Sequence, residues 1–297
     1  MSAPNTIGEL GVWTWIDTMS ASDATEFARQ LEAWDYSALW IPEAVGRDPF
    51  AMLGYLAANT ETLVLATGIA NIYARDPMTM RAAQLTLGEM APGRFVLGLG
   101  VSHTNIVTGL RGHEYKPPVP AMREYLEAME KSVFTGVRPE GEPPIVIGAL
   151  REKMLRLSAG MTRGAHPYFV PPEHTKKARE TLGPDAWLCP EQKVLLETDP
   201  AVARRVAREA MAVYVQLPNY QNNLLELGFE ASDFENGGSD RLVDAIVAWG
   251  DEQALADRIR AHRDAGANHV CIQPIRADGG PGPDLRVLEA LAPATAE

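Results

Sequence analysis

The chain has 297 residues, of which 46% are hydrophobic and 22% charged, a balance typical of a soluble globular protein and sufficient for one large domain. Its formal net charge of −12 argues against nucleic acid or an anionic membrane as the main partner, because both attract clustered Lys and Arg. Cys189 and Cys271 lack metal-ligand spacing, so neither a metal site nor a disulfide framework is expected. No signal peptide and no apolar run of about 18 residues is present, which predicts a cytoplasmic protein.

Short apolar runs alternate with amphipathic stretches along the chain. The apolar runs predict strands at residues 8–15, 37–41, 63–68, 95–99, 144–147, 165–170, 194–197 and 269–273. Apolar residues at helical spacing predict a helix that opens at Ser22, and others over residues 50–58, 78–90, 120–133, 153–161, 200–215 and 254–265. Two long connections, residues 104–120 and 216–240, are candidate lids or subunit contacts.

About eight strands, each followed by a helix, fit either an open doubly wound sheet or a closed (β/α)8 barrel. The dinucleotide fingerprint would favour the open sheet, but Gly98 and Gly100 supply only its first two glycines. The chain length and the number of repeats favour the barrel. We therefore expect an α/β protein with a TIM-barrel fold, a single domain over residues 1–297, and extended loops after the fourth and seventh strands.

Two of the predicted strands end in glycine and polar residues, within the stretches LVLATGIANIYARDP and GRFVLGLGVSH. In parallel α/β proteins the loops at the C-terminal strand ends carry the chemistry. The first candidates for the lining of a pocket are therefore Gly68, Asn71, Gly100, Ser102 and His103. Trp13 and Trp15 alternate at the end of the first strand and either form an apolar wall at the mouth or belong to the barrel core.

A second set of strand ends is rich in small residues. Gly148, Ala149 and Leu150 follow a predicted strand and precede a helix, where backbone N–H groups at a helix start would hold a phosphate. The next strand offers a second part of such a cradle in Gly164, Ala165 and His166. Tight turns and close packing explain the same small residues equally well.

The two stretches above, together with PPIVIGAL, RGAHPYFVPPEH and AGANHVCIQP, resemble the bacterial luciferase-like superfamily and, within it, the F420-dependent oxidoreductases of actinobacteria. The segment TGIANIYARDP resembles the methylenetetrahydromethanopterin reductases, in whose relatives a non-prolyl cis peptide often supports the flavin-like ring. The resemblance implies a cis bond between Gly68 and Ile69 and coenzyme F420 as the cofactor. It also implies a cofactor site lined by Trp13, Gly68, Ile69, Ala70, Asn71, Gly100, Val101, Ser102, Gly148, Ala149, Leu150, Gly164, Ala165 and His166.

The same resemblance implies the catalytic residues. His103 stands where sugar-phosphate dehydrogenase relatives have a glutamate thought to act as the acid, so its imidazole would exchange a proton beside the hydride-transfer carbon, with Glu43 nearby. Taken without the family, a lone histidine is more often structural. Relatives often show Asp-His where this chain has Glu43 and Ala44, which argues against a sugar-phosphate substrate.

The leading hypothesis is an F420-dependent oxidoreductase that moves a hydride between the deazaflavin C5 and a small organic substrate. The alternative is a luciferase-like monooxygenase that uses FMN, because the two cofactors place their rings and phosphates in similarly shaped sites. A non-catalytic flavin-binding barrel is a second alternative. A small-molecule substrate is the expected partner, and a homodimer packed through the barrel helices is common among relatives.

Overall fold

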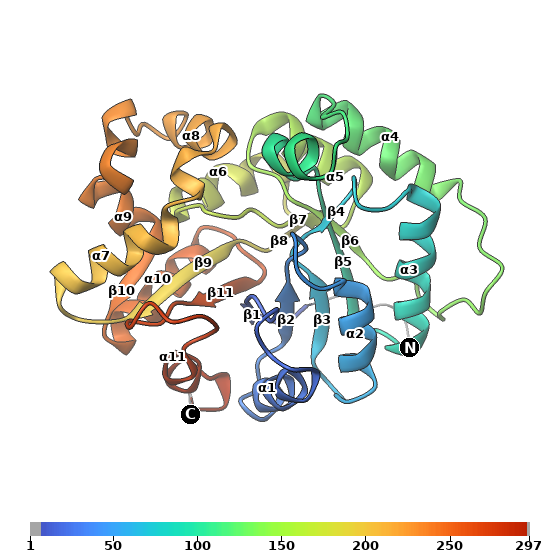
Figure 1. Ribbon diagram of the computed structural model, residues 1–297, viewed down its shortest axis with the longest axis horizontal. Helices are drawn as coiled ribbons and strands as arrows, with labels where there is room; N and C mark the ends of the chain where they lie inside the picture. Colours follow the sequence, from blue (N-terminus) through green and yellow to red (C-terminus); the bar gives the residue numbers. More distant parts are fainter. Residues whose placement is uncertain (1–6, 296–297) are drawn as a thin grey trace.

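The chain forms one parallel sheet, seen in a computed structural model that describes residues 7–295 (Figure 1). The strand order is β10-β9-β11-β1-β2-β3-β5-β6-β7-β8, and β4 pairs with β5 off this path. The strands are β1 (Leu10–Trp13), β2 (Ala38–Ile41), β3 (Val64–Thr67), β4 (Ala70–Asn71), β5 (Phe95–Gly100), β6 (Ile145–Ile147), β7 (Gly164–Ala165), β8 (Trp187–Leu188), β9 (Glu191–Leu196), β10 (Val247–Gly250) and β11 (Val270–Pro274).

The chain itself joins β8, at one end of this path, to β9, which closes the sheet into a barrel with β10 outside the ring. Only Cys189 and Pro190 separate β8, which pairs with β7, from β9, which pairs with β11. The Cys189 N–H donates to Ala165 O at 2.9 Å, and Pro190 O accepts from the Cys271 N–H at 2.9 Å, so hydrogen bonds continue on both sides of the junction. The predicted TIM-barrel fold is confirmed, with β10 added beside β9 as an extra parallel strand.

Helices surround the sheet and connect successive strands (Figure 1). Asp48, Asp76 and Asp199 each accept backbone N–H groups at a helix start and precede a proline, a pairing that favours helix initiation. The α-helices are α1 (Ala21–Ala33), α2 (Pro49–Ala57), α3 (Pro77–Met90), α4 (Pro118–Glu130), α5 (Glu152–Met161), α6 (Pro172–Leu182), α7 (Pro200–Met211), α8 (Pro218–Leu225), α9 (Asp240–Ile246), α10 (Glu252–Asp264) and α11 (Leu285–Ala290). Within residues 7–295 no helix has the length and apolar character needed to cross a bilayer.

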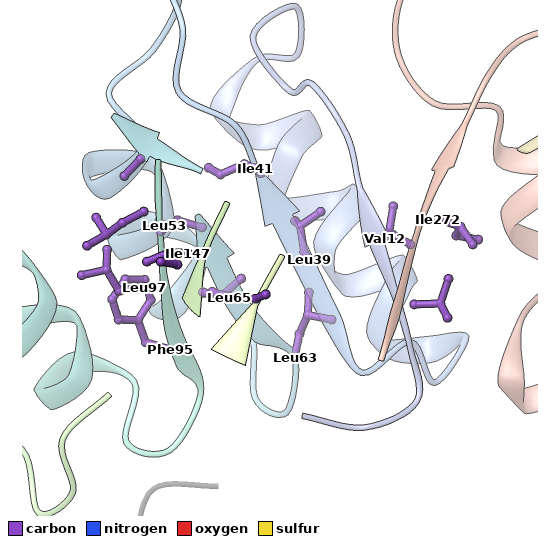
Figure 2. Packing of buried hydrophobic residues seen from close by; sticks show 14 of the residues in the cluster. Val12, Leu39, Ile41, Leu53, Leu63, Leu65, Phe95, Leu97, Ile147 and Ile272 are labelled. Atoms are coloured by element: carbon purple, nitrogen blue, oxygen red, sulfur yellow. The ribbon is translucent and has the colours of Figure 1, made fainter. Parts of the chain in front are cut away.

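The core has two layers because successive strand residues point to opposite faces of the sheet. Leu39, Leu65 and Leu97 lie on the outer face, in the cluster that packs against the helices; Leu53 of α2 belongs to the same cluster (Figure 2). The residues between them point into the barrel, where a separate cluster includes Trp13, Ala38, Trp40, Ala66, Val96, Val146, Trp187, Cys189 and Cys271. The barrel interior is therefore filled by side chains, and a site must lie at one of its rims.

Several predicted elements differ from those observed. The strand predicted at residues 165–170 is only β7, because Pro167 lacks an N–H group for the ladder and Phe169 has a φ of 62°. The strand predicted at residues 194–197 begins earlier, since the polar sequence Glu191-Gln192-Lys193 is buried in β9. Helix α7 ends at Met211, short of the predicted residue 215. The predictions omitted the strands β4, β8 and β10 and the helices α6, α8, α9 and α11.

The two long connections contain short helices. A π-helix, η1 (Asn105–Leu110), follows β5, and three 3-10 helices lie later in the chain: η2 (Tyr214–Gln216), η3 (Ala231–Gly237) and η4 (Pro293–Thr295). Helix α8 lies between η2 and η3, so the connection predicted over residues 216–240 is largely helical. In Figure 1, α8 lies on the same upper side of the molecule as β4, which continues the direction of β3. Both long connections thus add structure beside the C-terminal strand ends.

Candidate functional site

The central part of the site is the end of β3, where the chain turns through Gly68 and Ile69 into β4. The peptide bond between these two residues is cis, as the resemblance implies. Glycines let this turn pack tightly on β5, because a Cβ at Gly98 would lie 1.9 Å from Thr67 O and one at Gly100 would lie 2.5 Å from the Ile69 side chain. The Trp13 indole N–H donates to Gly68 O at 2.6 Å, which fixes the turn from inside the barrel.

Asn71, at the end of β4, carries a buried hydrogen-bond donor without a protein partner. Its side chain is buried with the residue at 1% exposure, and its Oδ1 accepts from the Tyr73 N–H at 2.9 Å. Because this hydrogen bond requires an acceptor, it identifies the oxygen end of the side-chain amide. The nitrogen end, Nδ2, has no partner among the described residues. Because buried polar groups are almost always paired, a free amide donor at a strand end indicates a site for an acceptor on a ligand.

Glu43 secures the same turn from the neighbouring strand end. Its N–H donates to Ile69 O at 3.1 Å, and its carboxylate accepts from the Asn71 N–H at 2.8 Å. The Arg75 guanidinium donates to the other carboxylate oxygen at 2.6 Å and also pairs with Asp48. The geometry shows Glu43 holding backbone in place; its implied role as a second catalytic group stays a prediction.

Arg75 and Asp76, adjacent in the loop after β4, have different partners. Arg75 contacts Glu43 and Asp48, whereas Asp76 accepts from the Met78 and Thr79 N–H groups at 3.0 Å and begins α3. The partners differ because the Arg75 side chain points back toward the end of β2, whereas that of Asp76 faces the start of α3. Ala44 lies on this rim as well, and its carbonyl accepts from Arg111 of the first long connection at 3.0 Å.

His103 lies three residues beyond β5, on the strand end next to β4. Ser102 before it has a φ of 56°, and His103 O accepts the Ile106 and Val107 N–H groups that open η1. The half-buried imidazole contacts the Tyr220 ring of α8, with 5.7 Å between ring centroids. Burial lowers the pKa of the His103 imidazole.

The end of β6 offers backbone donors at a helix start. Helix α5 begins at Glu152 without any side-chain hydrogen bond to its N-terminus. The Gly148 N–H is occupied by Leu99 O at 2.8 Å, yet a Cβ at Gly148 would meet nothing nearer than 3.7 Å. Packing within the chain therefore does not require glycine there, and the space over residues 148–151 suits a phosphate on the uncapped helix.

The residues predicted to complete that cradle from β7 are engaged elsewhere. A Cβ at Gly164 would lie 2.0 Å from Trp187 O, so this glycine is required for close strand packing. The His166 imidazole points into the barrel, stacks on Trp40 with centroids 4.6 Å apart, and donates from Nδ1 to Cys189 O at 2.7 Å. Burial lowers the pKa of His166 to about 4, which keeps it neutral. Its Nε2 is buried without a partner among the described residues, and its implied place in the cofactor site stays a prediction.

An aromatic wall borders the site, and the sequence analysis identified only parts of it. Tyr168 contacts Trp13 with ring centroids 5.0 Å apart and Tyr214 at 5.2 Å, and Trp15 meets Trp13 edge-on. The wall consists of Trp13, Trp15, Tyr168, Phe169, Tyr214 and Tyr220. Tyr168 also donates to Gln273 Oε1 at 2.9 Å.

Behind this wall lies a buried ion pair that sequence reasoning missed. The Lys193 ammonium is fully buried, 3.1 Å from Glu191 Oε1 and 4.0 Å from the Tyr168 ring centroid. Glu191 also accepts from the Phe169 N–H at 3.2 Å, which holds the left-handed Phe169 in place. The sequence pattern that could have revealed this pair is the spacing of Glu191 and Lys193, which places both on one face of a strand. Charged residues in a sequence normally indicate solvent exposure, however.

The candidate site residues thus lie at the C-terminal rim of a parallel α/β barrel. Barrel proteins that bind a small molecule at their strand ends have the same arrangement. A family model described as luciferase-like monooxygenase matches residues 7–269, and the chain belongs to this family. Among the described residues, no group of three His, Cys, Asp or Glu side chains is placed to hold a metal ion.

Individual relatives share the fold and part of the sequence. A Mycobacterium tuberculosis protein assigned as a coenzyme F420-dependent oxidoreductase is 25% identical over 281 residues, which span 80% of this chain and 79% of that protein. An F420-dependent secondary alcohol dehydrogenase, solved with an F420–acetone adduct, superposes over 100% of both chains with a TM-score of 0.74 at 15% identity. The oxygenating constituent of 3,6-diketocamphane monooxygenase from Pseudomonas putida, solved with FMN, has a TM-score of 0.68 at 14% identity and covers 90% of this chain and 91% of its own. At these identities the two structures show the fold alone.

Proposed function

We propose that this protein is an F420-dependent oxidoreductase, which transfers a hydride between the deazaflavin C5 and a small organic substrate. The observation that best supports a bound cofactor is the buried, unpartnered Nδ2 group of Asn71 at the strand end. The likeness to the mycobacterial F420-dependent oxidoreductase over 80% of the chain supports F420 as that cofactor.

The rim residues fit the two ends of such a cofactor. The turn at Gly68 and Ile69 provides a wall for a flat ring, and the Asn71 amide donates to an acceptor at the ring edge. The uncapped start of α5 after residues 148–150 suits the phosphate, because helix N-termini attract anions. Glu43 and Arg75 keep the ring wall in position through the Asn71 backbone.

When bound, reduced F420 supplies a hydride, and its oxidised form accepts one. The chain supplies the matching proton: protonated His103 gives a proton to the substrate atom that gains an electron pair as the hydride adds to its neighbour. In the opposite direction neutral His103 takes that proton from an alcohol. The aromatic wall packs on the substrate and excludes water from this exchange.

Fluorescence titration of the purified chain with oxidised F420 and with FMN tests the cofactor. We expect micromolar or tighter binding of F420 and much weaker binding of FMN; preference for FMN would refute the proposal. His103→Ala should leave F420 affinity nearly intact and lower turnover by about a hundredfold, as loss of a general acid does. Unchanged turnover would return His103 to a structural role.

A monooxygenase that uses FMN is the second candidate. The ring wall and the uncapped helix suit FMN as well, and the FMN-bound monooxygenase from Pseudomonas putida has the same fold. FMN binding together with substrate-dependent oxygen consumption would favour it. Cofactor binding without turnover on broad panels of electron acceptors would favour a non-catalytic barrel.

A further inference from the structure

Helix α8 contacts the rim near both of its ends. In its first turn, Tyr220 contacts the His103 ring beyond β5, with 5.7 Å between ring centroids. Just past its last residue, the Glu226 carboxylate lies 3.6 Å from the guanidinium of Arg151, which directly precedes α5. Six helical residues rise about 9 Å, so one short helix connects the end of β5 with the start of α5.

The face of α8 that packs on the barrel carries a polar residue between these two contacts. The buried residues of the helix are Tyr220, Asn223 and Leu224. They share one face, because helical residues three and four apart are neighbours. Tyr220 and Leu224 belong to the buried cluster of Phe169, against which Leu150 after β6 also packs. Asn223 therefore points toward the rim, midway along α8 between its two contacts.

Asn223 is buried, yet one of its polar atoms is unpaired. The residue is 2% exposed, and its side-chain Nδ2 has no partner among the described residues. A buried amide without a partner costs free energy, and buried polar groups are almost always paired. Asn71, which is 1% exposed, has the same unpaired Nδ2 at the end of β4. The described part of the rim thus carries one such donor on a strand end and another on α8.

We propose that Asn223 binds the cofactor and donates from Nδ2 to an oxygen of the polyhydroxylated chain that joins the ring to the phosphate. This inference rests on the proposed function, which has the ring at the Asn71 turn and the phosphate at the start of α5. F420 and FMN both carry such a chain, and its hydroxyl oxygens accept hydrogen bonds. Asn223 lies midway between the contacts of α8 with the end of β5 and the start of α5, which is the path of that chain.

Weak ion pairs at the far end of α8 allow the cofactor to reach this amide. Glu226 pairs with Arg151 and with Lys177, each at 3.6 Å, and all three side chains are about half exposed. Such exposed pairs contribute little to stability, so this end of α8 can move away from the rim at small cost. The buried side chain of Leu224 then packs the helix back over the bound chain.

The first test measures thermal melts without cofactor. Asn223→Ala removes the unpaired amide, and Asn223→Leu does the same while refilling the space with a branched side chain. Asn222→Ala is the matched control, because Asn222 is the exposed neighbour of the same type on the same helix. Neither Asn223 variant loses a hydrogen bond to the protein, so at least one should melt no lower than the parent. Melting of both below the parent, with a normal control, would make Asn223 a structural residue and overturn the proposal.

The second test is fluorescence titration with F420 and with its precursor FO, which has the ring and the hydroxylated chain but no phosphate. Both Asn223 variants should bind each ligand about tenfold more weakly, as expected for one lost hydrogen bond, and Asn222→Ala should bind both normally. Affinities equal to those of the parent would overturn binding by Asn223. A loss for F420 alone would put the contact at the phosphate and overturn the assignment to the chain.

Failure of the proposed function gives a different result, because the parent protein itself then does not bind F420. If the parent binds FMN instead, FMN and riboflavin take the places of F420 and FO, and the same comparison of Asn223 with Asn222 decides the inference. A parent protein that binds neither cofactor would refute both proposals.

Discussion

Replacing Glu43 by alanine and by glutamine distinguishes its role as a backbone clamp from a role in proton transfer. The carboxylate is 7% exposed, accepts from the Asn71 N–H at 2.8 Å, and pairs with Arg75 at 2.6 Å. Alanine removes both contacts, whereas glutamine keeps an acceptor for the Asn71 N–H and loses the charge. The two variants therefore differ mainly in whether the end of β4 remains fixed.

The expected losses follow from these contacts. A hydrogen bond to a charged group contributes about 1.5–3 kcal/mol. Loss of one partner of a buried ion pair costs about 3–5 kcal/mol, but Arg75 keeps Asp48, so only part of that applies. We expect Glu43→Ala to lower the free energy of unfolding by about 3 kcal/mol and Glu43→Gln by about 1 kcal/mol.

Urea unfolding followed by tryptophan fluorescence measures both losses, and F420 titration measures the effect on the ring wall. Affinity should fall for Glu43→Ala and change little for Glu43→Gln. Glu209→Ala is the control, because the Arg205–Glu209 pair is exposed on both sides and such pairs contribute about 0–1 kcal/mol. Equal losses in the two Glu43 variants would refute the clamp. Glutamine with normal stability and affinity but no turnover would instead make Glu43 a proton-transfer group.

Two further predictions concern stability. Gly98→Ala should prevent normal folding, because its Cβ would lie 1.9 Å from Thr67 O. Gly160→Ala in α5 places a Cβ that meets nothing within 4 Å and should stabilise the protein by up to about 1 kcal/mol. Thermal melts of both variants test this, and a native melting temperature for Gly98→Ala would contradict it. Burial lowers the pKa of four histidines from 6.5, to about 4 for His166 and His174 and about 3 for His262 and His269. The unfolded chain therefore binds more protons below pH 6.5, so their stabilisation is complete above that pH and is lost as the pH falls toward 4, by up to about 1.4 kcal/mol per histidine per pH unit. Urea midpoints at pH 7 and pH 5 measure it, and equal midpoints would contradict the burial of these side chains as neutral groups.

The strand ends that carry the site were readable from local sequence, and the contacts across the rim were not. Gly68, Asn71 and His103 each follow an apolar run, so their places at the ends of β3, β4 and β5 depend on neighbours in the chain. His166 directly follows β7, yet its imidazole packs against Trp40 inside the barrel. The direction of a side chain at a strand end depends on the register and twist of the whole sheet, which no short stretch specifies.

The sequence by itself determined the alternation of strands and helices and the strand ends on which the site lies, because strand and helix periodicities are local properties of consecutive residues. Chain length and the number of repeats favoured the barrel over the open sheet. Only the tertiary structure decided that Glu43 clamps Asn71 and that Glu191 and Lys193 form a buried pair. Each of these contacts pairs polar groups that look solvent-exposed in the sequence. Burial changes their energetics, because a charge or donor taken from water must find a partner. Closure of the barrel brings these partners together.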